Sequence, residues 1–456
     1  MNFGETETYL LSLGNEVSAM KLGLENIRKL LAALGDPQKK YLKVQVAGTN
    51  GKGSACAFLN SICLQAGIKT GMYTSPHLVS ITERIQIEGT NISNDDFARI
   101  ATRVREVAEC LVADGEIENV PTFFEQVTAI ALLAFADAKV GLAILETGLG
   151  GRLDATTAAN AEIAAITRID YDHQQYLGET IQEIAAEKAA IIRHGLRVVL
   201  GEQKPEVMEV IRERCRKVGV QPRVADEAIA TQSRNPIGME GVAPGIAETP
   251  SIPVGLLPVR FTTSKADYSE IRLGLLGHHQ IENAKVAILL AEFLQDNFRI
   301  TSDHIVSGLE TARHPGRMEW IAPYLLDGAH NVGGARALRA YLDEFVQKPV
   351  TMIYGSIDDK DVKEIASVLF PRAERLILTT PDNSRAMRAE DILLFVPEGF
   401  DQGRVFVTPS ANAAIEKARE VSGKQDAILV TGSLYLVGEV HRILTAKPSE
   451  KLKTDN

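Results

Sequence analysis

A glycine-rich segment with one lysine and one serine follows a short apolar run near the start of the chain. Residues 47–54 read Ala-Gly-Thr-Asn-Gly-Lys-Gly-Ser, directly after the run 42–46. A strand, such a turn and a helix together direct backbone N–H groups and a positive helix end at a phosphate. Lys52 would neutralise the outer phosphates, and Ser54 could reach a phosphate oxygen or its Mg²⁺. The segment predicts a nucleoside triphosphate site. Because Gly53 interrupts the strict P-loop pattern, an ordinary glycine-rich turn stays the alternative.

Polar side chains stand at the ends of two further predicted strands. Glu146 follows the apolar run 140–145, and His173 comes just after the run 163–167. Ligands of open α/β sheets bind at the carboxyl ends of the strands. Glu146 is therefore placed to hold Mg²⁺ beside a phosphate loop. A solvated glutamate and a structural histidine stay the alternatives.

Lys188 lies on the apolar face of a helix predicted over residues 180–193. It follows Ile184 by four residues, so both side chains share the buried face. A lysine directed inward needs a reason, because lysine is rarely buried without a partner. Two simple explanations for its position are a charge pair with Glu187 and a side chain whose stem is buried while its amine extends to solvent.

Two more polar groups lie in the last third of the chain. Arg317 follows His-Pro-Gly at an apparent domain break, where a guanidinium could clamp a phosphate through two hydrogen bonds. A plain linker arginine is the alternative. Residues 327–331, Asp-Gly-Ala-His-Asn, follow a strand and open a helix, again at a ligand-binding edge. Asp327 and Asn331 equally suit a turn residue and a helix N-cap.

The elements that must position these residues alternate between β-branched runs and helical patterns. This alternation is typical of a parallel sheet covered by helices, which makes the fold class α/β. The rhythm fails at 226–262, which we interpret as an extended loop within a hairpin excursion. After the break at 314–316 a second series begins, so we expect domains over 1–313 and 314–456. Strands are predicted at 42–47, 69–73, 140–146, 162–167, 196–200, 317–326, 350–354, 375–379, 403–407 and 427–431, and helices at 53–66, 94–113, 123–138, 180–192, 205–218, 279–295 and 301–312.

Composition narrows the class of protein. With 456 residues the chain exceeds one ordinary core. Its net charge of −10 argues against a nucleic-acid or anionic-membrane partner. The four cysteines lack metal-ligand spacing, and we see no signal peptide or membrane span, so we expect a cytoplasmic protein with reduced thiols.

Taken as an ordered set, the motifs resemble the folylpolyglutamate synthase/dihydrofolate synthase family of the Mur ligase superfamily. The resemblance runs from about residue 18 to 445. It implies a P-loop-containing, Mur-ligase-like central domain followed by a smaller Rossmann-like C-terminal domain. The motifs are residues 47–54, 74–78, 146–156, 172–173, 187–189, 277–284, 315–317, 327–331 and 431–433.

The resemblance also implies roles for individual residues. Lys52, Glu146, His173 and Lys188 would form the catalytic group. Ser75 and Glu146 would bind one Mg²⁺ and His173 a second, while Lys188 matches a lysine that is carbamylated in the family and becomes a carboxylate-like metal ligand. ATP would be held by Asn50, Gly51, Lys52, Gly53, Ser54, Asn283, Arg317, Asp327 and His330. The pterin pocket would be lined by Leu22, Gly23, Thr122, Phe123, Phe124, Glu125, Leu153, Asp154 and Ala155. Thr157 replaces the usual asparagine, which leaves fine substrate preference open.

The resemblance implies an ATP-dependent carboxylate–amine ligase. The γ-phosphate would pass to a substrate carboxylate, and the amine of L-glutamate would then displace phosphate from the acyl phosphate. We expect dihydropteroate and reduced folate both to be acceptors of one monomeric chain, and Asp154→Ala to impair the two reactions unequally. A ligase for a UDP-muramoyl acceptor is the alternative, although a phosphate loop beginning at residue 47 leaves little room for a UDP domain. A non-catalytic nucleotide-binding protein is a second alternative.

Overall fold

The computed structural model describes residues 1–14, 23–232, 258–358 and 360–446, which form two compact units. The first unit comprises the described residues of Met1–Thr231, Val259–Gly274 and Gln280–Arg313. The second comprises the described residues of Gln232–Pro258, Leu275–His279 and His314–Asn456. Within these described residues, no helix is long and apolar enough to cross a membrane.

An eight-stranded sheet forms the centre of the first unit. Its order is β4-β3-β2-β5-β1-β6-β7-β8, and only the β2–β3 and β3–β4 pairs are antiparallel. In register, Val46 faces Glu146 and Ala47 faces Ile166, so the carboxyl ends of β1, β5 and β6 meet at one edge. The strands are β1 (Leu42–Ala47), β2 (Thr70–Tyr73), β3 (Ile85–Ile87), β4 (Thr90–Asn91), β5 (Leu142–Glu146), β6 (Ile163–Ile166), β7 (Arg197–Leu200) and β8 (Arg223–Val224).

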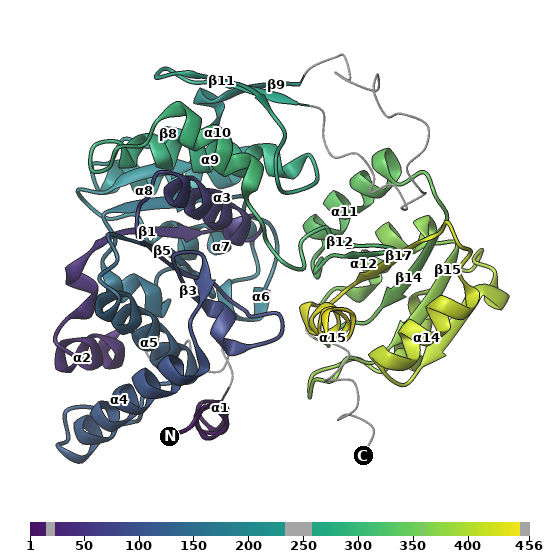
Figure 1. Ribbon diagram of the computed structural model, residues 1–456, viewed down its shortest axis with the longest axis horizontal. Helices are drawn as coiled ribbons and strands as arrows, with labels where there is room; N and C mark the ends of the chain where they lie inside the picture. Colours follow the sequence, from purple (N-terminus) through teal and green to yellow (C-terminus); the bar gives the residue numbers. More distant parts are fainter. Residues whose placement is uncertain (15–22, 233–257, 359, 447–456) are drawn as a thin grey trace. The chain divides into compact units, whose positions relative to one another are not determined.

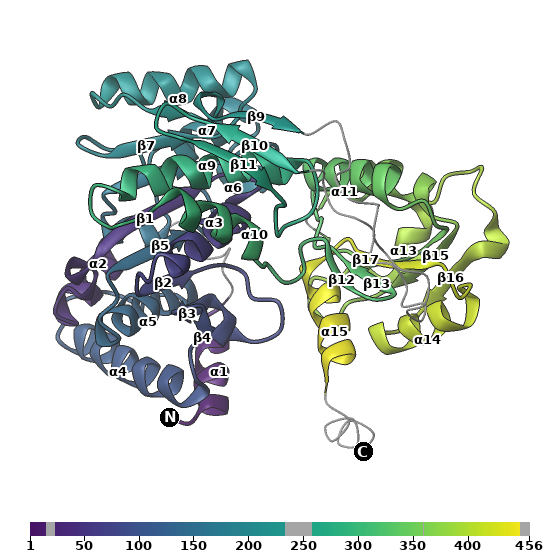
Figure 2. The ribbon, with the colours of Figure 1, turned by 45° about the horizontal axis from the view of Figure 1, so that its top comes forward.

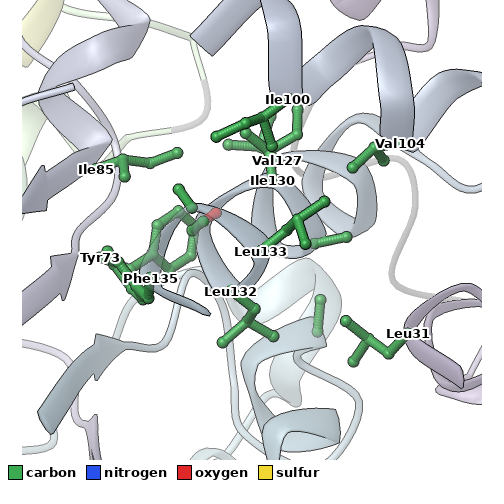
Figure 3. Close-up of a cluster of buried hydrophobic side chains, with 14 of the residues drawn as sticks. Leu31, Tyr73, Ile85, Ile100, Val104, Val127, Ile130, Leu132, Leu133 and Phe135 are labelled. Atoms are coloured by element: carbon green, nitrogen blue, oxygen red, sulfur yellow. The ribbon is translucent and has the colours of Figure 1, made fainter. Parts of the chain in front are cut away.

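Helices cover both faces of this sheet (Figures 1 and 2). One face packs on α2, α4 and α5 through a large apolar cluster, part of which Figure 3 shows around Tyr73 and Phe135. The same face continues onto α7 and α8 through Ala164 and Ile166. On the other side, α3 packs against the strands and against α10. The helices are α1 (Phe3–Ser12), α2 (Glu25–Ala33), α3 (Lys52–Gln65), α4 (Asn94–Ala113), α5 (Phe123–Asp137), α6 (Gln174–Leu177), α7 (Ile181–Ala189), α8 (Pro205–Lys217), α9 (His279–Leu294) and α10 (Ser302–Thr311).

A separate three-stranded sheet accounts for part of the predicted loop over 226–262. Strands β9 (Ile229–Gln232), β10 (Val259–Thr262) and β11 (Asp267–Ile271) lie in the order β11-β10-β9. The two ends of the stretch, 229–232 and 259–262, thus form neighbouring strands of this sheet, in agreement with a hairpin excursion. Residues 233–257 lie outside the described chain. The buried Glu292 connects this sheet to α9, because its carboxylate accepts hydrogen bonds from the hydroxyls of Thr263 and Tyr268.

The second unit is a six-stranded sheet in the order β12-β13-β17-β14-β15-β16. The single strand predicted over 317–326 is wrong: β12 (Glu319–Ile321) and β13 (Tyr324–Leu326) form an antiparallel hairpin, and Pro323 in its turn has no N–H to donate to a ladder. Helices α11, α12 and α13 share the apolar cluster on one face, and α14 and α15 pack against the strands and each other. The remaining elements are β14 (Val350–Tyr354), β15 (Arg375–Thr379), β16 (Val405–Thr408), β17 (Ala427–Thr431), α11 (Val332–Phe345), α12 (Val362–Leu369), α13 (Ala389–Ile392), α14 (Ala411–Val421) and α15 (Leu434–Thr445).

Candidate active site

The glycine-rich turn between β1 and α3 has the geometry of an anion cradle. Gly51 is the N-cap of α3 at φ +90°, and no side chain caps the helix. The N–H groups of Thr49 and Asn50 both donate to the carbonyl of Arg168, at 2.9 and 3.0 Å, which fixes the first half of the turn. The N–H groups of the first turn of α3 therefore remain available for a phosphate.

Glycine is required in this turn because its neighbours approach closely. A Cβ on Gly48, at φ +151°, would lie 2.0 Å from Oγ1 of Thr167. A Cβ on Gly51 would lie 2.1 Å from Oδ1 of Asn283. Asn283, predicted from the family to contact ATP, is thus brought directly onto the phosphate loop from α9.

A buried hydrogen-bonded chain links α9 to the loop. Gln280 donates from Nε2 to Oγ of Ser54 at 3.2 Å and accepts from Nδ2 of Asn283 at 2.9 Å. Gln280 is 1% exposed, yet sequence reasoning did not assign it to the site. Its spacing of three residues from Asn283, on the same helix face, is the signal that could have found it. Lys52 folds back onto its own loop, where Nζ donates to the carbonyl of Thr49 at 3.2 Å.

Oxygen ligands suited to Mg²⁺ gather at the ends of β2 and β5. Glu146 is buried, and its Oε2 accepts a hydrogen bond from the N–H of Ser75 at 3.4 Å. The Oγ of Ser75 is buried and has no hydrogen-bond partner within the described chain. A buried hydroxyl without a partner is costly unless something else binds it, so these two groups fit a hard cation.

His173 stands beyond the end of β6, as predicted. It is the N-cap of α6 at φ +50°, and its N–H donates to Oδ1 of Asp172 at 3.0 Å. Among the described residues no group of three or more His, Cys, Asp or Glu side chains could hold a metal alone.

Lys188 is buried on α7 and points at the phosphate loop. Its Nζ donates to the carbonyl of Gly48 at 2.9 Å. Burial, assisted by the charge of Lys52, lowers the pKa of Lys188 to about 7. The charge pair with Glu187 is wrong, because Glu187 accepts from Nε of Arg152 at 2.9 Å. The amine does not extend to solvent either, since Lys188 is 4% exposed.

Residues 122–125, the first of two segments predicted to line the pterin pocket (the acceptor segments), form the start of α5. Thr122 is the N-cap and Glu125 completes its capping box, so both side chains organise the helix start. Burial raises the pKa of Glu125. Phe124 packs 6.1 Å from the ring of Tyr73 and against Gly148, where a Cβ would lie 2.4 Å from the Phe124 ring. The segment thus touches both β2 and the loop after β5.

The second acceptor segment, residues 153–155, is fixed by hydrogen bonds to the side chain of Asp154. Its buried carboxylate accepts from the N–H groups of Gly148 and Leu149, at 2.8 and 3.0 Å, and from Thr156. Burial raises its pKa. These bonds begin the short 3₁₀ helix Ala155–Ala159, against which α2 packs. Gly23, at φ +82°, precedes α2, and Leu22 lies outside the described residues.

Arg317, Asp327 and His330 lie together in the second unit. Asp327 is buried at the end of β13 and accepts from the N–H groups of Met318 and Ala329, at 2.9 and 3.0 Å. Nη1 of Arg317 and Nδ1 of His330 both lie against the carbonyl of Gly328, at 3.3 and 2.8 Å.

Asp327 and Asn331 take the two structural roles named above, a turn residue and a helix N-cap, and the ATP contact of Asp327 stays a prediction. Burial raises the pKa of Asp327 while Arg317 opposes the rise. Asn331 is the N-cap of α11, where its Oδ1 accepts from the N–H of Gly334 at 2.8 Å. Asp327 therefore fixes the turn beside Arg317 through its hydrogen bonds, and Asn331 caps the N-terminus of α11.

Comparison with known proteins agrees with this arrangement. The family described as Mur ligase middle domain matches residues 46–291, and the one described as Mur ligase, glutamate ligase domain matches residues 316–434. A Bacillus subtilis protein named dihydrofolate synthase/folylpolyglutamate synthase is 33% identical over 93% of this chain and 95% of its own length. A Mycobacterium tuberculosis folylpolyglutamate synthase, complexed with ADP and AMPPCP, superposes with a TM-score of 0.85 at 30% identity, covering 98% and 99% of the two chains. An Escherichia coli structure in complex with DHPP and ADP has a TM-score of 0.82 at 27% identity, covering 97% and 98%. The chain therefore belongs to the folylpolyglutamate synthase/dihydrofolate synthase family of ATP-dependent glutamate ligases, within the Mur ligase superfamily.

Proposed function

We propose that this protein ligates L-glutamate to dihydropteroate and to reduced folates, each through an acyl phosphate formed with ATP. The observation that carries the proposal is one edge of the first sheet. There the uncapped start of α3, the oxygens of Ser75 and Glu146, and Gly148 follow the neighbouring strands β1, β2 and β5. Phe124 at the start of α5 packs against Tyr73 at the end of β2 and against Gly148.

The residues of the chain position charge rather than attack the substrate. The first-turn amides of α3 and Lys52 stabilise the charge that develops on the transferred phosphoryl group. The Nζ of Lys52 donates to the carbonyl of Thr49, so it lies on the loop proposed to hold the phosphates. Buried surroundings strengthen these interactions, because the local dielectric constant is low.

Two Mg²⁺ ions complete the proposed site, and when bound they neutralise phosphate charge. Ser75 and Glu146 would hold the first, and His173 with carbamylated Lys188 the second. The lowered pKa of Lys188 supports the modification, since only a neutral amine adds CO₂. The structure of a relative named bifunctional folylpolyglutamate synthase/dihydrofolate synthase has Mn, AMPPNP and L-glutamate bound, which supports a divalent metal and these substrates.

The family resemblance supports Arg317, Asp327 and His330 as further ATP contacts. Arg317 and His330 lie against the same carbonyl, and Asp327 holds the turn that carries them. A guanidinium in this position suits a phosphate, because it can donate two parallel hydrogen bonds.

The choice of acceptor is the part that needs direct measurement. Some relatives carry both names, while those of Saccharomyces cerevisiae and Lacticaseibacillus casei are named dihydrofolate synthetase and folylpolyglutamate synthase alone. We expect glutamate-dependent phosphate release with dihydropteroate and with tetrahydrofolate, and none with a UDP-muramoyl peptide. Activity with only one pterin would remove bifunctionality, and activity with the muramoyl peptide alone would overturn the proposal.

A monomeric state and a cytoplasmic location stay predictions. All four cysteines are free, and Cys56, Cys63 and Cys215 are buried, which suits a reducing compartment. Sedimentation of the purified chain tests the monomer.

A further inference from the structure

The loop that follows β5 is fastened to the end of α7 by Arg152. Its Nε donates to both carboxylate oxygens of Glu187, at 2.9 and 3.2 Å, and its N–H donates to the Glu187 carbonyl at 3.0 Å. Gly151 lies against the same turn, because a Cβ there would stand 2.9 Å from the carbonyl oxygens of Glu187 and Lys188. Side chain, backbone and close packing thus join the same two short segments.

Consecutive residues of α7 therefore face two different parts of the site. Glu187 holds the loop that continues into the acceptor segment 153–155, whereas Lys188 donates to the carbonyl of Gly48 in the phosphate loop. Successive residues of a helix project about 100° apart, so one turn can contact both segments. A displacement of the acceptor loop that moves Glu187 also moves Lys188, because a hydrogen-bonded turn shifts as a unit.

We propose that Arg152 is a positioning residue that couples the order of the acceptor loop to the placement of Lys188. The inference rests on the proposed function, since it assigns acceptor and nucleotide to these two loops. Arg152 acts through Glu187, and its side chain is 58% exposed. Such an exposed pair adds little to global stability, so its effect is expected in coupling between ligands. By linkage, acceptor and nucleotide then strengthen each other's binding by the same factor.

The test compares Arg152→Met with Arg152→Lys in the full-length protein. Nucleotide affinity is measured with AMPPNP and Mg²⁺, in the absence and presence of saturating dihydropteroate or tetrahydrofolate, without glutamate. Arg388→Met is the matched control, because Arg388 also makes two 2.9 Å bonds to one carboxylate, that of Asp391, in a segment with no predicted site residue.

We expect Arg152→Met to raise the acceptor KM about tenfold, which corresponds to about 1.4 kcal/mol. The affinity for AMPPNP should then be nearly the same with acceptor as without it. Nucleotide affinity without acceptor should stay within twofold of the parent. Arg152→Lys should fall between, since it keeps the charge but loses the paired geometry. Glu187→Gln should reproduce Arg152→Met, and the double variant should add nothing further.

Two results would overturn the inference. In one, acceptor KM and nucleotide coupling match those of Arg388→Met. In the other, nucleotide affinity without acceptor and thermal stability fall together with acceptor KM, which indicates a merely structural role. Failure of the proposed function is distinguishable, because the parent protein itself would then ligate glutamate to neither pterin.

Discussion

Replacing Lys188 with methionine should stabilise the ligand-free protein while removing its activity. Methionine keeps the apolar stem and removes the buried amine. The pKa of Lys188 falls from 10.5 to about 7, and each unit corresponds to about 1.36 kcal/mol, so keeping this amine buried costs about 4 to 5 kcal/mol at pH 7. Loss of the hydrogen bond to Gly48 subtracts about 1 kcal/mol. The expected gain at pH 7 is about 3 kcal/mol.

The sign of the pH dependence follows from which state binds more protons. Between pH 7 and 10.5 the unfolded chain holds the Lys188 proton and the folded chain does not. Stability of the parent therefore rises with pH through this window, and below pH 7 the full cost remains. The methionine variant lacks this rise, so its advantage should shrink to about 1 kcal/mol at pH 9.

Urea unfolding at pH 7, 8 and 9, in CO₂-free buffer without Mg²⁺ or nucleotide, measures the difference. Far-UV circular dichroism follows both units together, whereas fluorescence of Trp320, the sole tryptophan, follows the second unit and should not change. A shift seen by circular dichroism but not by fluorescence therefore belongs to the first unit. Lys43→Met is the matched control: Lys43 is buried but bonds Glu162 at 3.0 Å and two carbonyls, so its loss should destabilise at every pH. A Lys188→Met advantage that is absent, or equal at all three pH values, would refute the reasoning.

Three further outcomes are expected. Lys52→Ala should lower kcat more than 100-fold, because the charge on the transferred phosphoryl group loses its partner. The circular dichroism spectrum should not change, since Nζ bonds only its own loop in the described structure. Near-normal turnover at saturating ATP would contradict the assignment of Lys52. Gly148→Ala should raise the acceptor KM about tenfold and leave AMPPNP affinity unchanged, because its Cβ would displace the Phe124 ring 2.4 Å away; an equal loss of nucleotide affinity would contradict this. Asp154→Ala should impair both pterin reactions alike rather than unequally, because its carboxylate holds its own loop, and rate measurements with dihydropteroate and tetrahydrofolate decide between the two expectations.

Strands with continuous apolar runs were predictable from the sequence, as were the helices that separate them. β1, β14, β15 and β17 match their predicted ranges, because buried parallel strands have few alternatives to an extended apolar run. The short strands β3, β4 and β8 near the two edges of the first sheet were not predicted, since two or three residues are too few to show a periodicity. The chain at 317–326 looked like one strand because its turn, Ala322-Pro323, is itself apolar.

The candidate site divides along similar lines. Glycines, Lys52 and Glu146 stand next to predicted strands, so their shared edge could be inferred from topology. The partners of Lys188 could not, because Gly48 is 140 residues away in sequence and only the fold brings its carbonyl to the amine. Gln280 could not be predicted for the same reason, because only the fold shows that its amide bonds Ser54 and Asn283.

The close approaches of the site glycines restrict how the site can change during evolution. Gly48 abuts Thr167, Gly51 abuts Asn283, and Gly148 abuts the Phe124 ring. Gly48 and Gly51 have φ of +151° and +90°, so a side chain there stays strained even after the neighbour has become smaller. At Gly148 the restriction comes from the Phe124 ring, so a larger residue there weakens acceptor binding unless residue 124 becomes smaller first. Positions 124 and 148 should therefore covary among relatives. The pair at positions 124 and 148 differs from the others, because it lies at the acceptor segments rather than the phosphate loop. A compensated exchange there would reshape the acceptor slot while leaving nucleotide binding intact, and it offers lineages a two-step route to a new acceptor preference.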